Sequence, residues 1–130
     1  MKIKITGIGS YIPALKIHNT DFDKHVFLNE DGSAFAYPND VVISKFKGIT
    51  GIEQRRYAED HLNSSDLAFF ASEKAIEDAK IDPETIDYII YAHNFGDVNH
   101  GTIQTDTLPS LATRVKNKLQ IKNPKCVAYD

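Results

Sequence analysis

The chain has 130 residues and a formal net charge of −3 at pH 7, and 42% of its residues are hydrophobic and 25% charged. This length suits one ordinary domain, because single domains commonly hold about 100 to 150 residues, and the acidic balance argues against a nucleic-acid partner. No run approaches the roughly 18 consecutive apolar residues of a membrane span, and one cysteine cannot form an internal disulfide. We therefore expect a cytoplasmic protein with no nucleic-acid or membrane partner.

The first predicted element is a strand over residues 2–8, where apolar and polar side chains alternate. Gly7 and Gly9 follow, before Pro13, and this order predicts a central strand that closes into a tight turn. The glycine pair is similar to a dinucleotide-binding fingerprint. However, Ile12 stands at the third glycine position and no helix follows, so the turn is the favoured interpretation.

Two short helices are predicted over residues 19–25 and 39–47. The residues suited to cap them are Asn19 for the first helix and Asn39 or Asp40 for the second. Residues 27–38, between the two helices, combine turn-forming residues with three aromatic side chains. This combination predicts an ordered surface loop.

A longer helix is predicted from Ser65 to Lys80, capped by Ser64 or Ser65 and with Asp66 in its first turn. Small residues recur on one face of this helix and would let it approach its neighbours closely. They are Ala68, Ala71 or Ser72, Ala75 and Ala79.

The rest of the chain predicts strand, helix and strand. Residues 87–92 form the first strand, a helix begins near Thr107 or Leu108, and residues 125–130 form the last strand. The predicted helix carries a single apolar stripe of Leu111, Val115 and Leu119. Alternating strands and helices predict an α/β fold, with a mixed, mostly parallel sheet and helices on both faces.

The loop 93–100 contains two histidines and an aspartate, so a metal site is one interpretation and a polar loop is another. His93 and His100 are seven residues apart, which fits no compact ligand motif, and the loop is the favoured interpretation. Its place after a strand is still informative, because binding crevices form at the carboxyl ends of the strands in open α/β sheets.

Cys126 invites assignment as a nucleophile, because it is the one cysteine of the chain. A nucleophilic thiol needs a helix N-terminus or a basic neighbour, whereas Cys126 lies in an apolar strand next to Val127 and Ala128. We therefore predict a small buried hydrophobic residue that an acyl donor or iodoacetamide leaves largely unmodified in the native protein.

Five segments together carry a resemblance to a known family. They are ITGIGSYIP at 5–13, ITGIEQRRY at 49–57, the helix 65–80 leading into Ile81-Asp82-Pro83, IDYIIYA at 86–92, and Leu108-Pro109-Ser110. In this order and spacing they resemble the start of a 3-oxoacyl-acyl-carrier-protein synthase III (ketoacyl synthase III). This enzyme is the initiating condensing enzyme of fatty-acid synthesis, and it has a thiolase-type fold.

The resemblance implies that residues 1–130 are a single, incomplete N-terminal domain of a thiolase-like enzyme, about two fifths of its length. In the family, the nucleophilic cysteine follows the strand that residues 126–130 resemble, and the catalytic histidine and asparagine lie much further on. The apolar run 125–130 likewise reads as a buried strand with nothing after it to pack against. We expect no catalytic residue, metal or cofactor in this chain, no activity of the chain alone, and an exposed apolar face.

The resemblance also names candidate binding residues. An aromatic residue before the proline reaches the partner's acyl pocket in the family, and Leu108 holds that position here. The alternative is a core leucine at the start of a helix. Lys45, Arg55 and Arg56 belong to a basic cluster that could contact an acidic carrier protein or a coenzyme A phosphate, or form a solvated face. The family holds coenzyme A with a tryptophan and an arginine, but this chain has no tryptophan, which favours a carrier-bound acyl group or a relative from secondary metabolism.

The implied function of the parent protein is a decarboxylating condensing acyltransferase of fatty-acid or related polyketide biosynthesis. Its implied partners are acyl carrier protein and acyl thioesters, and homodimerisation or self-association is expected. Two alternatives remain open. One is a small free-standing α/β binding module whose ligand lies over residues 93–100, and the other is a non-catalytic partner of a condensing enzyme.

Overall fold

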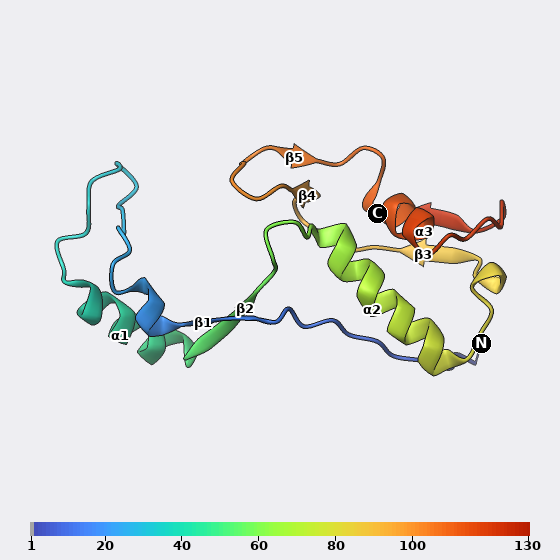
Figure 1. Cartoon of the computed structure of the whole chain (residues 1–130), viewed down its shortest axis with the longest axis horizontal. Coiled ribbons are helices and arrows are strands. Elements are labelled where there is room, and N and C mark those ends of the chain that lie inside the picture. Colours follow the sequence, from blue (N-terminus) through green and yellow to red (C-terminus); the bar gives the residue numbers. More distant parts are fainter. Residues whose placement is uncertain (1) are drawn as a thin grey trace. The chain divides into compact units, whose positions relative to one another are not determined.

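The computed structural model describes residues 2–130, which form two compact units (Figure 1). Unit 1 joins the chain up to Ile12 to Glu59–Asp130, and unit 2 is Pro13–Ala58. Within residues 2–130, no helix combines the length and the apolar character needed to cross a membrane.

Helix α2 (Ser64–Ala79) is the longest element of unit 1 and matches the predicted helix to within one residue at each end. Its N-cap is Asn63, whose backbone N–H donates to the Asp66 carboxylate at 2.8 Å. The predicted serine caps are wrong, because Ser65 donates its N–H and its hydroxyl to the buried carboxylate of Asp97.

The predicted strand over residues 2–8 is wrong. These residues are extended but pair with no strand of the described chain, and they run along α2 (Figure 1, dark blue). The Ile8 N–H donates to Asp78 at 2.9 Å, and the Lys74 amine donates to the Ser10 carbonyl at 3.0 Å.

Gly7 and Gly9 serve this contact with α2 rather than a tight turn. A Cβ atom at Gly9 would overlap the backbone at Ala71 and Ala75, and one at Gly7 would lie 2.7 Å from the Ala79 Cβ. The predicted small face of α2 is therefore the surface against which the N-terminal segment packs.

Strands β3 (Tyr88–Ile90) and β6 (Val127–Tyr129) pair in parallel. Helix α3 (Leu111–Lys118) lies between them in sequence and packs against both, so these three elements form the predicted strand–helix–strand unit of an α/β fold. The remaining strands of unit 1, β4 (Asp97–Val98) and β5 (Thr105–Asp106), pair antiparallel. A 3₁₀ turn, Pro83–Thr85, precedes β3.

The core of unit 1 is built on α3. Leu111 and Val115 of the predicted stripe are fully buried and Leu119 is half-buried. Cys126 is also buried, as a free thiol. The helix begins three residues after Leu108, with the Ser110 hydroxyl accepting a hydrogen bond at its N-cap. The prediction of a buried cysteine is thus confirmed.

Unit 2 contains the antiparallel pair β1 (Leu15–His18) and β2 (Gln54–Tyr57), a 3₁₀ helix Asn19–Phe22, and α1 (Asn39–Thr50). The second predicted helix is confirmed, whereas the first is a single 3₁₀ turn. The predicted caps Asn19, Asn39 and Asp40 are wrong, because the N-caps are His18 and Pro38. The asparagine side chains instead donate to backbone carbonyls of neighbouring segments. The Asn39 amide donates to the carbonyls of Asp23 and His25 at 2.8 and 2.7 Å.

The loop between these elements is ordered by its own contacts, as predicted. The Phe27 ring lies 6.3 Å from Phe35 and 5.7 Å from Phe46, measured between ring centroids. The Ser33 N–H and hydroxyl both donate to Asp31, at 2.9 and 2.6 Å, and these two hydrogen bonds lower the pKa of that carboxyl.

Candidate functional site

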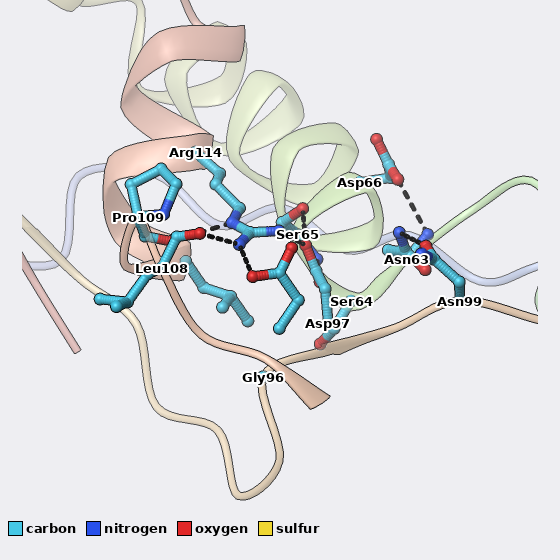
Figure 2. A network of polar contacts seen from close by, with 12 residues as sticks. Asn63, Ser64, Ser65, Asp66, Gly96, Asp97, Asn99, Leu108, Pro109 and Arg114 are labelled. Atoms are coloured by element: carbon cyan, nitrogen blue, oxygen red, sulfur yellow. Dashed lines mark hydrogen bonds and ion pairs between the residues drawn. The ribbon is translucent and has the colours of Figure 1, made fainter. Parts of the chain in front are cut away.

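A buried carboxylate, Asp97, is the centre of a polar network in unit 1 (Figure 2). It follows Gly96 at the start of β4 and its residue surface is only 3% exposed. The Ser65 backbone N–H and hydroxyl donate to its two oxygens at 2.8 and 2.6 Å, and the Arg114 guanidinium donates at 3.0 Å. A buried charge is stable only when it is paired and hydrogen-bonded, and Asp97 meets both conditions.

Arg114 extends the network from α3 to the segment before that helix. Its Nε donates to the Pro109 carbonyl at 2.9 Å, and its remaining terminal nitrogen donates to the Leu108 carbonyl at 3.0 Å and to Asp106 at 2.8 Å. The hydrogen bond and charge of Asp106 raise the pKa of Arg114, and Arg114 in turn lowers the pKa of Asp106. The guanidinium therefore remains charged and uses all three of its nitrogens.

An open hollow of about 490 Å³ lies over this network. Its lining residues come from α2, α3 and the segments that join them: Asn63, Ser65, Asp66, Asp97, Asp106, Leu108, Pro109, Thr113, Arg114, Asn117 and Lys118. The charged side chains that line it are paired. Arg114 pairs with Asp97 and Asp106, and Lys118 pairs with Asp66 at 2.7 Å. Ser65 is buried and its hydroxyl proton is donated to a carboxylate, so this hydroxyl is no accessible nucleophile. The hollow is suited to binding rather than to covalent chemistry.

A second polar group joins the carboxyl ends of β3 and β6. His93 Nε2 lies 3.2 Å from Asp130, while the Gly96 N–H donates to His93 Nδ1 at 2.9 Å. Asp130 also accepts the N–H groups of Leu111 and Ala112, at 2.6 and 2.7 Å, at the start of α3. Because Nδ1 accepts a hydrogen bond, the ring proton of neutral His93 lies on Nε2 and faces Asp130.

The two histidines of the loop 93–100 lie in separate pairs. His93 faces Asp130, and His100 Nδ1 lies 3.2 Å from Asp60. Within residues 2–130, no three His, Cys, Asp or Glu side chains gather in a way that could hold a metal ion.

Leu108, which the resemblance predicts to contact the acyl chain, has a hydrogen-bonded backbone carbonyl and an exposed side chain. The residue is 83% exposed, although its carbonyl accepts a hydrogen bond from Arg114. Its role remains a prediction.

The two predicted basic residues of β2 are tied to unit 2 itself. Arg55 lies over the Phe22 ring, 5.1 Å from its centroid, and donates to the Asn19 side chain at 3.2 Å. Arg56 donates to the Ala14 carbonyl at 3.1 Å.

Lys45, the third predicted basic residue, lies on α1 with its amine 4.8 Å from the centroid of the Tyr37 ring. It lines one hollow with Tyr37, whereas Arg55 lines another with Phe22. The structure therefore does not bring the basic residues into one hollow, and their contact with a carrier or coenzyme A stays a prediction.

Four residues that organise unit 1 were not predicted from the sequence to do so: Ser65, Asp97, Arg114 and Asp130. Asp97 stands in a Gly-Asp pair that is typical of a turn, and Arg114 stands beside the apolar stripe of its helix, where a solvated side chain is the usual interpretation. No local pattern distinguishes these residues from exposed ones, because their partners come from other elements.

Solved structures define the class of protein to which this fold corresponds. A 3-oxoacyl-(acyl-carrier protein) synthase from Burkholderia xenovorans matches with a TM-score of 0.68 at 21% identity, covering 95% of this chain and 30% of that one. The 3-oxoacyl-(acyl carrier protein) synthase III of Pseudomonas aeruginosa matches with a TM-score of 0.65 at 26% identity, covering 93% and 30%. The chain therefore has the α/β fold of part of a thiolase-like condensing enzyme, as predicted.

Curated relatives narrow this class further. The β-ketoacyl-[acyl-carrier-protein] synthase III of Staphylococcus haemolyticus is 37% identical over 122 residues, which are 94% of this chain and 32% of the relative. The Vibrio cholerae protein β-ketoacyl-[acyl-carrier-protein] synthase III 1 is 36% identical over all 130 residues, which are 34% of its length. The predicted resemblance to this synthase is confirmed.

The chain spans about a third of the length of the curated relatives it matches. No family model matches it.

Proposed function

We propose that the whole protein containing this chain is a decarboxylating condensing acyltransferase, similar to β-ketoacyl-ACP synthase III, in fatty-acid or related polyketide biosynthesis. The similarity of all 130 residues to such a synthase from Vibrio cholerae carries this proposal. Its substrates are acyl thioesters and a malonyl thioester, and its protein partner is acyl carrier protein. The protein works in the cytoplasm as a homodimer.

The reaction has two covalent steps. A cysteine thiolate attacks the acyl thioester, forms an acyl-enzyme and releases the thiol of the donor. The malonyl thioester then loses carbon dioxide, and its carbanion attacks the acyl-enzyme to give the 3-oxoacyl thioester and the free cysteine. Donors aimed at the developing oxyanions stabilise both steps.

Residues 1–130 contribute the frame of this site rather than its nucleophile. Within unit 1, β3 and β6 end on the same side because they run in parallel. The pairing of His93 with Asp130 holds these two strand ends together. The chain alone therefore forms no condensation product.

Leu108 contacts the acyl chain, and Lys45, Arg55 and Arg56 contact the acidic carrier protein or a coenzyme A phosphate. The exposure of the Leu108 side chain on a held backbone supports the first assignment. Lys45 and Arg56 are exposed, which supports the second.

The test compares the natural protein with the 130-residue chain in the presence of acyl and malonyl thioesters. We expect 3-oxoacyl product, detected by mass spectrometry, from the natural protein and none from the chain alone. We also expect Cys126 to remain unacylated, because it is buried. Rapid stoichiometric acylation of Cys126, or product from the chain alone, would contradict the assignment of the chemistry to residues outside 1–130.

The natural reading frame past the codon for Asp130 provides an independent check. The proposal expects a cysteine a few residues further on and a histidine and an asparagine much later. Another residue at the cysteine position would instead favour a non-catalytic partner of a condensing enzyme. A stop codon directly after Asp130 would favour a small binding module.

A further inference from the structure

We propose that Arg114, anchored by Asp97, is a positioning residue that sets which acyl chain lengths the protein accepts, by holding the backbone of Leu108. This inference rests on the proposed function and assigns a role to two residues that touch no substrate themselves. It is based on a contrast at Leu108. The carbonyl of this residue accepts a hydrogen bond from the Arg114 guanidinium, whereas the residue is 83% exposed.

The clamp is directional because a guanidinium is planar and its donors are fixed relative to one another. Nε of Arg114 donates to the Pro109 carbonyl at 2.9 Å, and a terminal nitrogen donates to the Leu108 carbonyl at 3.0 Å. Two consecutive carbonyls are thus held by one rigid group. A lysine has a single point-like ammonium and cannot reproduce this geometry.

The anchor of the clamp lies deep in unit 1. Asp97 is 3% exposed and receives hydrogen bonds from Ser65 of α2 as well as from Arg114, whose side chain is 17% exposed. Gly96, just before it, has a φ of +76°, and a Cβ there would lie 2.8 Å from the Asp106 carbonyl oxygen. The backbone at Asp97 is therefore closely confined, and a shift of Arg114 would leave a buried carboxylate without its charge partner.

An exposed apolar side chain on a fixed backbone can discriminate between acyl chains of different length. One methylene more or less against an apolar surface changes kcat/KM by about 10- to 200-fold. Such discrimination requires the side chain to stay in place, because a mobile leucine adapts to chains of different length.

The experiment measures kcat/KM of the natural protein for a short and a medium-length straight-chain acyl thioester, and the readout is their ratio. We compare wild type with Leu108→Ala, Arg114→Ala, Arg114→Lys, Asp97→Asn and the double variant Leu108→Ala/Arg114→Ala. We expect both alanine variants to shift the ratio by about tenfold in the same direction, and the double variant to shift it no further than either alone. Arg114→Lys should fail to restore the wild-type ratio.

Lys116→Ala is the matched control. Lys116 lies on the same helix and also donates to two backbone carbonyls, those of Asn123 and Cys126, at 3.0 and 2.7 Å. Within residues 2–130, the Lys116 side chain forms no hydrogen bond with Leu108 or Pro109. Its replacement should lower the thermal stability and leave the ratio unchanged.

The outcomes separate the two proposals. The Arg114 variants could lose kcat/KM equally for the short and the medium-length acyl thioester while Leu108→Ala shifts the ratio. That result would overturn this inference and leave the proposed function intact. A wild-type protein that forms no condensation product would overturn both. If Arg114→Ala does not fold, Arg114→Lys and Asp97→Asn carry the test, and an unchanged ratio in both would overturn the inference.

Discussion

Asp130 shows how one carboxylate can join three elements. It closes the end of β6, accepts the first two N–H groups of α3 and pairs with His93 after β3. Burial disfavours its charged form, but the backbone N–H groups and His93 outweigh that effect and lower the pKa of Asp130. The ionised carboxylate is therefore the form that the fold stabilises.

Replacing Asp130 with asparagine should lower the free energy of unfolding at pH 7 by about 1 kcal/mol, because a charged acceptor at the helix start is lost. A carboxyl whose pKa is lowered on folding stabilises the fold above its unfolded pKa of about 3.9, and this contribution disappears as the pH falls through the lower folded value. The variant should therefore lose less stability than wild type between about pH 5 and pH 2. Thermal unfolding across this range measures both effects.

Asp87→Asn is the control for this prediction, since the Asp87 side chain makes no ion pair or hydrogen bond within residues 2–130. Its acid profile should match that of wild type. Equal acid profiles for wild type and Asp130→Asn would show that Asp130 does not contribute as the structure indicates.

At the scale of elements, the contact between the N-terminal segment and α2 depends on small residues on both sides. Gly9 lies against the α2 backbone at Ala71 and Ala75, whose side chains are single methyl groups. Backbone-to-backbone contact of this kind leaves no space for an added carbon.

Gly9→Ala should therefore lower the free energy of unfolding by about 1–3 kcal/mol, the usual effect of overpacking. Gly48→Ala is the matched comparison. Gly48 lies inside α1 and nothing is within 4 Å of an added Cβ, so alanine should stabilise that helix by about 0.5–1 kcal/mol. Hydrogen exchange resolved by peptide separates the effects on the two units. Faster exchange in α1 and unchanged exchange in α2 would be the opposite of this expectation.

At the scale of the whole molecule, one face of the β3–β6 pair is apolar and exposed. The parallel register aligns Tyr88 with Val127 and Ile90 with Tyr129, so these four side chains share a face, and all four are exposed. Parallel strands in α/β proteins are normally covered on both faces. An exposed apolar face was expected from the sequence and is present.

Apolar patches of this kind favour association, so the 130-residue chain should self-associate as its concentration rises. Ile90→Lys, which places a charge on the face, should shift the chain toward the monomer in sedimentation velocity measurements. Ile49→Lys changes an exposed isoleucine of unit 2 and should leave association unchanged. If Ile90→Lys associates as strongly as wild type, another surface is responsible.

Helices and strands with strong apolar periodicity were predictable. The stripe of Leu111 and Val115 identified α3, and the apolar runs around Ile89 and Ala128 identified β3 and β6, because each pattern lies within one element. The prediction of a strand over residues 2–8 was wrong. Its alternation is that of a strand, but a strand also needs a partner, and the described chain offers it a helix instead.

The α/β class, the main helices, the buried cysteine and the resemblance to a condensing enzyme could all be predicted from the residues alone, since periodicity and motif order are properties of neighbouring residues. The burial of Asp97, the hydrogen bond from Arg114 to Leu108 and the joining of three elements by Asp130 became visible in the three-dimensional structure. The partners of Asp97 are 32 and 17 residues away, on α2 and α3. Contacts over such separations depend on how the elements pack, and packing is not encoded in any local pattern.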